Sequence, residues 1–376
     1  MRHASRSGAV GALAMLLALF LPVGFYEDDY AYWWQFPSAM ALLVVGPLSY
    51  IAGALALTHL RNGRVWAVAG PAAAAVAAAG PIALPTSELE MGWQASGFWL
   101  AMVGIALFGW SVMSHLARMP RDRIRDIAVP ALFGLLLVYF WQAIVVAFAV
   151  KQVLLPAPTA IAAALERSAD VLAGDFQQTF LKAVLAGFVL GNAAAFLTAL
   201  LADRFPFIQR GLLPLGNLAS TVPIVGIAPI MVMWFGFGWE SKSAVVVLMI
   251  FFPMLVNALA GLNAADRMSL DLMRSYGASY GQTLLKLRLP MALPFLFNAL
   301  KINSTLALIG AIVSEFFGSP TAGMGFRINI ENGRMGLDMV WATIAVAAVA
   351  GSAFYGILAL LERAFTFWHP SYRAQN

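Results

Sequence analysis

The sequence predicts an all-α, polytopic membrane protein with about ten transmembrane helices. Of its 376 residues, 61% are hydrophobic and 11% are charged, whereas soluble globular proteins carry about 25% charged and about 45–50% apolar residues. The mean hydropathy is +0.80, which a lipid-facing surface explains more simply than one buried core. The chain contains no cysteine, and this excludes disulfides, thiolate metal sites and cysteine nucleophiles.

Ten segments are long and apolar enough to cross a bilayer, which requires roughly 20 mostly apolar residues. The predicted spans are 8–26, 37–60, 65–85, 97–117, 127–150, 180–202, 212–235, 244–262, 293–315 and 337–361. The first follows MRHASRS, which resembles the start of a signal peptide. Its apolar run is long, however, and EDDYAYWWQF follows without an A-x-A cleavage site, so we expect an uncleaved first helix.

The basic residues indicate how the predicted spans are oriented. With a cytoplasmic N-terminus, sixteen of the 23 Lys and Arg residues lie in inside segments and six in outside segments, and Lys301 lies within a span. This bias follows the positive-inside rule and places both termini in the cytoplasm. The net charge of +5 therefore reflects topology, and a role in binding nucleic acid is not indicated.

The charged run MPRDRIRD, residues 119–126, divides the chain into two predicted regions. Residues 1–120 form an accessory region of about four helices, with alanine runs such as 72–80 that favour close helix packing. Residues 121–376 contain about six helices and the longest predicted cytoplasmic loop, residues 263–292. No internal repeat suggests a duplicated secondary transporter.

The stretch DLMRSYGASYGQTLLKLRLP, residues 271–290, is unusually polar and basic for this chain. Gly277 allows a tight turn between two short helices, and Pro290 suits a break before the next membrane helix. The leucines between them make the segment amphipathic. Such a segment either lies on the lipid surface or docks into a groove of a soluble partner, and composition alone does not separate these alternatives.

This stretch resembles the EAA motif of ATP-binding-cassette importer permeases, E-A-A-x3-G-x9-I-x-L-P. Asp271 stands in place of Glu, and Gly277, Leu289 and Pro290 match the motif at the correct spacing. Leu272, Met273 and Leu287 replace the two alanines and the isoleucine. The E-A-A part is therefore degenerate, although the spacing is kept throughout.

Three further segments resemble the nitrate/sulfonate/taurine-type permeases of this family. They are LLPAPTAIAAALERS (154–168), STVPIVGIAPIMVMWFGFG (220–238) and SEFFGSPTAGMGFRINIENG (314–333). The resemblance covers roughly residues 127–370 and implies a six-helix permease core of the type I importer fold. The first four predicted spans have no counterpart in this plan.

The resemblance implies a transport subunit of the cell (plasma or inner) membrane that is not itself an enzyme. ATP and Mg would be held by separate ATPase subunits, and an external solute-binding protein and a second permease copy would complete the importer. The sequence agrees, because it contains no G-x4-G-K-[ST] phosphate loop; the nearest stretch, GFGWESKS, has Ser241 where the second glycine belongs. The residues expected to couple to the ATPase are Asp271, Arg274, Ser275, Gly277, Ala278, Lys286, Leu287, Arg288, Leu289 and Pro290.

Polar residues at membrane depth are the candidates for a substrate pathway, because they are costly there unless they serve a function. The residues selected are Thr221, Pro223, Asn303, Thr305 and Glu315. Asn, Ser and Thr also serve as interhelical hydrogen-bonding groups, and Glu315 either lines the entrance or caps the Gly-rich turn after it. Pro223 and Pro229 are expected to break the seventh span, which favours a position beside a water-filled cavity.

Two other functions remain open from the residues alone. A stand-alone secondary transporter or channel needs a relay carboxylate at mid-membrane, and Glu315 lies near a helix end. A membrane scaffold or enzyme would leave residues 271–290 resting on lipid, but acids and histidines do not cluster, and the four histidines show no metal-ligand spacing. The transported solute is expected to be small, of the vitamin-precursor, sulfonate or nitrate class.

Overall fold

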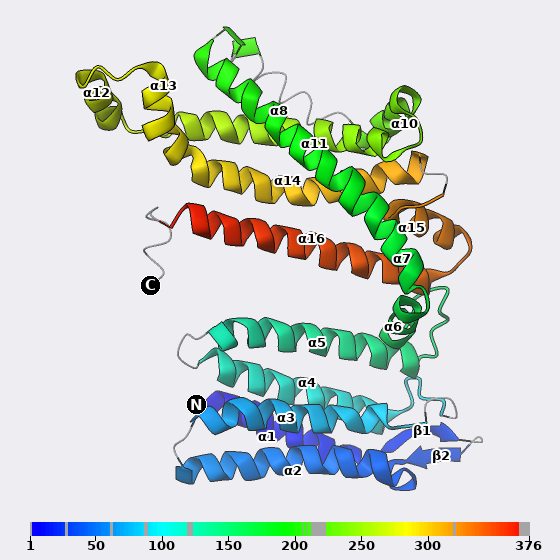
Figure 1. The fold of residues 1–376 in the computed structure, drawn as a ribbon. Coiled ribbons are helices and arrows are strands. Elements are labelled where there is room, and N and C mark those ends of the chain that lie inside the picture. The colour runs from blue at the N-terminus through cyan, green and yellow to red at the C-terminus, as the bar shows by residue number, and fades with distance from the viewer. Residues whose placement is uncertain are drawn as a thin grey trace. The chain divides into compact units, whose positions relative to one another are not determined.

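The computed structural model describes residues 2–26, 29–60, 63–85, 89–118, 123–205, 207–208, 210–211, 223–318 and 321–367. The chain divides into two compact units, Met1–Ile161 and Ala162–Asn376. Each unit is built mainly from long helices (Figure 1).

The first unit consists of helices and one small two-stranded sheet. Its elements are α1 (Arg2–Ala18), β1 (Pro22–Tyr26), β2 (Asp29–Tyr32), the 3-10 turn η1 (Trp33–Gln35), α2 (Pro37–Leu60), α3 (Gly63–Ile82), α4 (Ser96–Ala117) and α5 (Arg123–Ala147). Helix α6 (Pro158–Arg167) crosses the boundary between the units. Helix α1 packs against α4, and α2 packs against α3.

Small residues allow these helix pairs to approach closely. A Cβ atom added at Gly46 of α2 would lie 2.5 Å from the Cβ of Ala77 in α3, and one at Gly80 would lie 3.0 Å from the Ala39 carbonyl oxygen. Ala77 is fully buried. The alanine run of residues 72–80 is therefore part of a close helix contact, as small residues permit in membranes.

The first predicted span, residues 8–26, is only partly helical. Helix α1 ends at Ala18, and Pro22 begins strand β1, which pairs antiparallel with β2. Phe25 also exchanges backbone hydrogen bonds with Glu90 at 2.8 and 3.0 Å. Proline disfavours continuation of a helix, and these strand contacts satisfy the backbone of an apolar stretch that length alone assigned to a membrane helix.

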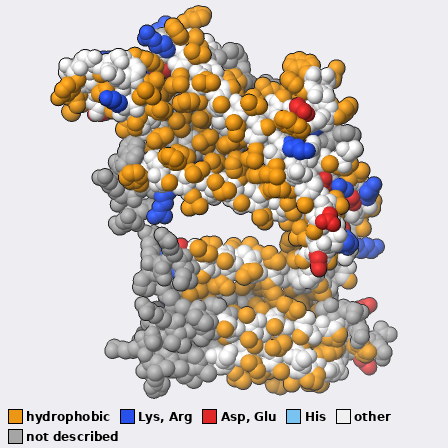
Figure 2. All heavy atoms as spheres, in the orientation of Figure 1, with side chains coloured by type: hydrophobic (Ala, Val, Ile, Leu, Met, Phe, Trp, Pro, Cys, Tyr) orange, Lys and Arg blue, Asp and Glu red, His pale blue; other side chains and the backbone are white. Residues whose placement is uncertain are grey.

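The second unit contains most of the remaining elements. They are α7 (Ala169–Phe176), the π-helical turn η2 (Gln177–Val184), α8 (Leu185–Arg204), α10 (Ile224–Phe235), α11 (Trp239–Leu262), α12 (Arg267–Ser275), α13 (Tyr280–Thr283), the π-helical turn η3 (Leu284–Arg288), α14 (Leu289–Gly318), α15 (Met324–Gly333) and α16 (Leu337–Phe365). Helix α11 packs against α8 and α14, and α14 packs against α16. In Figure 2 hydrophobic side chains cover much of the visible face of this unit.

Six helical stretches among the described residues are long and apolar enough to cross a membrane. They are Ser96–Ala117, Arg125–Ala147, Ala169–Arg204, Trp239–Leu262, Tyr280–Gly318 and Leu337–Phe365. Four shorter apolar helices, Arg6–Ala18, Pro37–Ser49, Ala72–Ile82 and Gly226–Phe235, lie at the other predicted spans. The described structure thus supports six of the ten predicted spans by length and composition.

Two prolines do not break helices as the sequence suggested. Pro229 lies inside α10, and Pro290 lies in the first turn of α14, directly after η3. The stretch from Tyr280 to Gly318 is one continuous helical segment. A π-helical turn changes the hydrogen-bonding pattern locally, so the chain passes Pro290 without leaving the helix. Pro223, by contrast, precedes the first residue of α10.

A buried polar cluster joins η2, α14 and α15 at the end of the second unit opposite α12 (Figure 1). The Glu315 carboxylate accepts hydrogen bonds from the Thr179 hydroxyl at 2.8 Å and from the Gly325 amide at 2.7 Å. The Met324 amide donates to the Thr179 oxygen at 2.7 Å. Glu315 therefore caps the amino end of α15, where free amides and the helix dipole favour an anion.

Neighbouring charges extend this cluster. Asp175 accepts hydrogen bonds from the Gly323 amide at 2.8 Å and from Arg327 Nε at 2.7 Å. Lys242, which is 1% exposed, donates to the carbonyl oxygens of Phe237 and Gly318. Buried charges are tolerated when they are paired and hydrogen-bonded, so the cluster fixes three helix ends relative to one another.

Replacing Gly323 by alanine is expected to destabilise the protein. Gly323 has φ +130°, and an added Cβ would lie 2.5 Å from Glu315 Oε1. Backbone strain of this kind costs about 1–3 kcal/mol, and the contact with the buried carboxylate adds to it. Thermal unfolding of the purified chain in detergent should show a lower midpoint for Gly323→Ala.

Gly333→Ala provides the matched control, because Gly333 belongs to the same helix and an added Cβ would meet no atom within 4 Å. Its unfolding midpoint should stay within error of the unmodified chain. Equal midpoints for the two variants would contradict the assigned tight packing around Glu315.

Candidate functional site: the segment α12–α13 and the polar residues of the bundle

Two short helices joined by a tight turn form the polar segment that the sequence singled out. The Asp266 side chain accepts a hydrogen bond from the Ser269 amide at 3.3 Å and begins α12. Gly277 has φ +65°, a conformation that glycine adopts without steric cost. Ser279 and Gln282 then form a capping box that begins α13. The predicted turn between two short helices is thus present at Gly277.

Several large apolar side chains are exposed on this segment although the segment is polar overall. Met268 is 81% exposed, Tyr276 is 82% exposed and Leu285 is 65% exposed. Exposed apolar side chains gathered on one segment indicate contact with a membrane or another protein. These side chains fit both alternatives that the sequence left open, contact with the lipid surface and docking into a groove of a soluble partner.

Five of the ten residues predicted to couple to an ATPase lie exposed on this segment. Arg274 NH1 pairs with Asp271 Oδ1 at 3.0 Å, and both side chains face solvent. The Ser275 hydroxyl donates to the Asp271 carbonyl oxygen at 2.9 Å, and Lys286 is exposed. The half-buried members are Ala278, Leu287, Leu289 and Pro290.

Arg288 differs from the other basic residues of the segment because it points inward. Its guanidinium pairs with Asp203 at the end of α8 and is only 16% exposed. The sequence placed Arg288 among the residues expected to couple to the ATPase, but here its charge is already neutralised within the chain. Asp203 was missed by sequence reasoning, since nothing in the pattern links residues 203 and 288.

A hollow of about 410 Å³ lies beneath the turn, between α12 and α13. Its lining includes Arg274, Tyr280, Thr283 and the end of α11 at Leu262 and Asn263. The segment contacts the membrane helices through Tyr280 and Arg288, and this hollow separates the rest of the turn from the end of α11.

Asn303 lies among three helices instead of facing an open cavity. It is fully buried, and its Nδ2 donates to Asn192 Oδ1 at 2.7 Å and to the Ile250 carbonyl oxygen at 3.0 Å. Its own Oδ1 has no hydrogen-bond partner in the described part of the chain. These contacts are those of an interhelical hydrogen-bonding group linking α8, α11 and α14.

Thr305 lies on a different face of α14 and is exposed. It lines an open hollow of about 630 Å³ together with Ile309 of α14, Ile328 of α15 and Ser352 and Tyr355 of α16. This hollow is largely apolar, with a few hydroxyl groups. Of the predicted pathway residues that the structure describes, Thr305 lines this hollow.

The remaining pathway candidates are not gathered at this hollow. Glu315 is 2% exposed and caps α15, which matches the capping alternative. Pro223 is exposed at the start of α10. Thr221 lies outside the described residues. The structure therefore does not bring the five predicted residues together into one site.

A buried ion pair between α14 and α16 was also not predicted from the sequence. Lys301 Nζ lies 2.6 Å from Glu362 Oε2, and the two side chains are 18% and 10% exposed. An acid and a base within apolar spans are expected to pair. Lys301 within one predicted span and Glu362 directly after another were the available signal, but sequence gives no means of pairing them across 61 positions.

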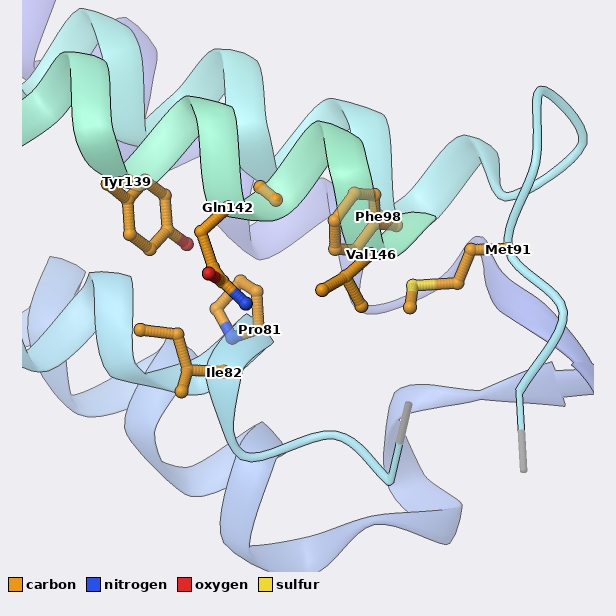
Figure 3. A pocket seen from close by; sticks show the side chains of 8 residues that line it. Pro81, Ile82, Met91, Phe98, Tyr139, Gln142 and Val146 are labelled. Carbon is orange, nitrogen blue, oxygen red and sulfur yellow. The ribbon is translucent and has the colours of Figure 1, made fainter. Parts of the chain in front are cut away.

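The first unit contains a small cavity of about 90 Å³ between the end of α3 and α5. Tyr139 and Gln142 point toward it, and the other labelled side chains around it are apolar (Figure 3). Gln142 Oε1 accepts a hydrogen bond from the Thr159 amide at 3.1 Å. Among the described residues that line this cavity, none carries a charged side chain.

Comparison with known protein families assigns the second unit. Residues 187–367 match the family described as the inner membrane component of binding-protein-dependent transport systems. A "Probable ABC transporter permease protein" of Haemophilus influenzae is 33% identical over 235 residues, which cover 62% of this chain and 95% of that protein.

Two further relatives carry more specific names. The formylaminopyrimidine transport permease of Halalkalibacterium halodurans is 32% identical, over 64% of this chain and 95% of its own length. The riboflavin transport system permease of Chloroflexus aurantiacus is 30% identical, over 63% of this chain and 88% of its own length. The resemblance noted in the sequence is confirmed, and it favours a permease subunit over a stand-alone transporter.

A binding-protein-dependent system of this kind works with separate ATPase and binding-protein components, and the present chain supplies the membrane part. The long apolar helices of the described structure agree with a multi-pass membrane subunit. The chain therefore belongs to the family of inner-membrane permease components of binding-protein-dependent ATP-binding-cassette transport systems.

Proposed function

We propose that this chain forms the translocation pathway of an ATP-driven importer and that α12 and α13 dock onto its ATPase subunit. The proposal rests mainly on the pair of short helices around Gly277, which exposes Met268, Tyr276 and Leu285 beyond the membrane helices. An amphipathic helix that presents apolar anchors suits a groove on a soluble partner. ATP and Mg are bound by that partner.

The helical connection to α14 supports a mechanical role for this segment. From Tyr280 to Gly318 the chain is helical without interruption, so a displacement of α13 is carried directly into the membrane helix. Closing of the ATPase subunits would thereby switch the pathway between outward and inward access. Arg274 and Lys286 are available for acidic groups on the partner.

The proposed topology places α12 and α13 in the cytoplasm together with both chain termini. Within the second unit, the carboxyl end of α16 lies at the same end as α12 and α13 (Figure 1). The basic residues of the sequence favour this end as the cytoplasmic side. The buried cluster around Glu315 then faces the exterior, where a solute-binding protein docks.

The pathway itself is assigned to the hollow beside Thr305, with Pro223 and Thr221 as candidates for its wall. Asn303 and Glu315 are buried in helix contacts and are not assigned to it. A second permease copy, most simply an identical one, would complete the pore. Relatives named for riboflavin and formylaminopyrimidine support a small organic solute of the vitamin-precursor class, and relatives named for sulfonates and taurine keep small anions as the alternative.

Residues 1–120 are proposed as an accessory membrane region outside the permease core. The family match begins at residue 187, and the first unit has its own buried core that includes Met15, Trp33 and Phe108. By its contacts α5 also belongs to this unit, although the sequence assigns it to the six-helix core of residues 121–376. The coupling segment remains the loop of residues 263–292.

Replacement of Gly277 by valine should remove the ATPase subunit from the purified complex. A β-branched residue at φ +65° is strained by about 1–3 kcal/mol, and relief of that strain reorients α12 relative to α13. We expect at least about tenfold less ATPase to co-purify in mild detergent, with the amount of membrane-inserted chain unchanged.

Gly281→Ala is the control, because Gly281 lies four residues away, has no left-handed φ and offers open space for a Cβ. It should retain the ATPase. If the ATPase subunit co-purifies with Gly277→Val in the normal amount, this turn does not dock onto the ATPase.

A single cysteine at position 305 tests the pathway assignment, since the natural chain contains none. In the complex, a membrane-impermeant thiol reagent should modify Thr305→Cys at least about tenfold faster than Ser304→Cys, because reactivity follows exposure. Ser304 is the neighbouring residue and is 1% exposed. ATP with vanadate should change the rate at position 305; a rate indifferent to nucleotide would remove Thr305 from the pathway.

A further inference from the structure

Arg288 connects the proposed docking segment to two membrane helices through one guanidinium group. Its NH1 and NH2 atoms donate to the two oxygens of Asp203 at 2.8 and 2.6 Å. Its Nε donates to the Leu262 carbonyl oxygen at 2.8 Å, and NH2 also reaches Asn263 Oδ1 at 3.2 Å. The segment is thus bonded at one point to the ends of both α8 and α11.

Tyr280 adds a second bond to the same carboxylate. Its hydroxyl donates to Asp203 Oδ2 at 2.7 Å, and the Arg204 guanidinium lies 5.1 Å from the centre of its ring. Asp203 therefore accepts hydrogen bonds from both α13 and η3 while it belongs to α8. We call the Asp203–Arg288 pair the joint, and the Tyr280 hydroxyl supports it.

The course of the chain shows why α8 needs this connection. The docking segment continues directly into α14 and follows α11 after four residues, Asn263–Asp266. Between α8 and the segment, however, lie more than 60 residues, including α10 and α11. Among the hydrogen bonds given for the described residues, those of the Asp203 side chain connect α8 to the segment.

We propose that movement of α12 and α13 reaches α8 through the joint, the Asp203–Arg288 pair. Asp203 is the positioning residue on α8. This inference rests on the proposed docking function. A bidentate guanidinium–carboxylate pair fixes orientation as well as distance. At 16% and 5% exposure it is shielded from competing water, and a push on η3 is transmitted to α8 instead of being absorbed.

The other ion pair of the segment does not share these properties. Asp271 and Arg274 are three residues apart on α12, and their side chains are 68% and 80% exposed. Exposed pairs of this kind contribute little, and this one joins α12 only to itself. The burial and the long sequence separation distinguish the joint from a helix-stabilising pair.

The test is hydrogen exchange of the complex, purified with its ATPase subunit, with and without ATP and vanadate. In the unmodified chain, nucleotide should change exchange both in residues 267–288 and in the last turn of α8, residues 201–204. In Asp203→Asn the change in residues 267–288 should persist, because the segment still docks, while the change in α8 is lost. Arg288→Lys should weaken the α8 response, because lysine cannot make the bidentate contact.

Two variants separate a joint from a purely structural pair. The exchanged pair, Asp203→Arg with Arg288→Asp, should restore the response of α8. Asp338→Asn breaks the ion pair between Arg167 and Asp338, which measures 2.9 Å and lies outside the segment, and it should leave both responses intact.

Each contrary result has a distinct meaning. A normal α8 response in Asp203→Asn overturns the joint and leaves docking standing. If Asp203→Asn also loses the response of residues 267–288, the pair holds the segment folded and is not a joint. If the unmodified chain shows no response in residues 267–288, the docking proposal fails, and the joint fails with it.

Discussion

Backbone amides and carbonyls that cross a bilayer must be hydrogen-bonded within the protein, and this constraint governs how such a chain can move. Helices satisfy it internally, so they shift as rigid bodies. Helix α14 and the helical turns before it run without interruption from Tyr280 to Gly318, even past Pro290. A displacement at the α13 end is therefore delivered along this stretch to its other end.

The two ends of this long stretch are held by different buried polar contacts. At one end Arg288 is bonded to Asp203 and the carboxyl end of α11. At the other end Glu315 bonds to Thr179 and caps α15, while Lys242 bonds the last carbonyl oxygen of α14. Both contacts bury charge with its partners, and they leave the middle of α14, including Thr305, to face the hollow beside α16.

Local patterns predicted four spans of the second unit, 180–202, 244–262, 293–315 and 337–361, and the turn at Gly277, because length, hydropathy and glycine conformation are local properties. Long-range pairing was missed: Asp203 finds Arg288, and Lys301 finds Glu362, only once the helices are packed. The predicted span 8–26 was wrong at its end. Its apolar run was taken as helix because of its length, but from Pro22 onward it is a strand, and Phe25 of this strand bonds to Glu90. Asn303 was predicted as a substrate-pathway residue, whereas in the fold its side chain is buried and bonds to Asn192.

The proposed coupling requires that the exposed apolar side chains of the docking segment, Met268, Tyr276 and Leu285, contact a protein and not lipid. A photo-reactive amino acid in place of Tyr276, which is 82% exposed, tests this directly in native membranes. The account predicts a cross-link to the ATPase subunit that disappears when that subunit is absent. Cross-links to lipid alone would mean that the segment lies on the membrane surface, and they would contradict the proposed coupling.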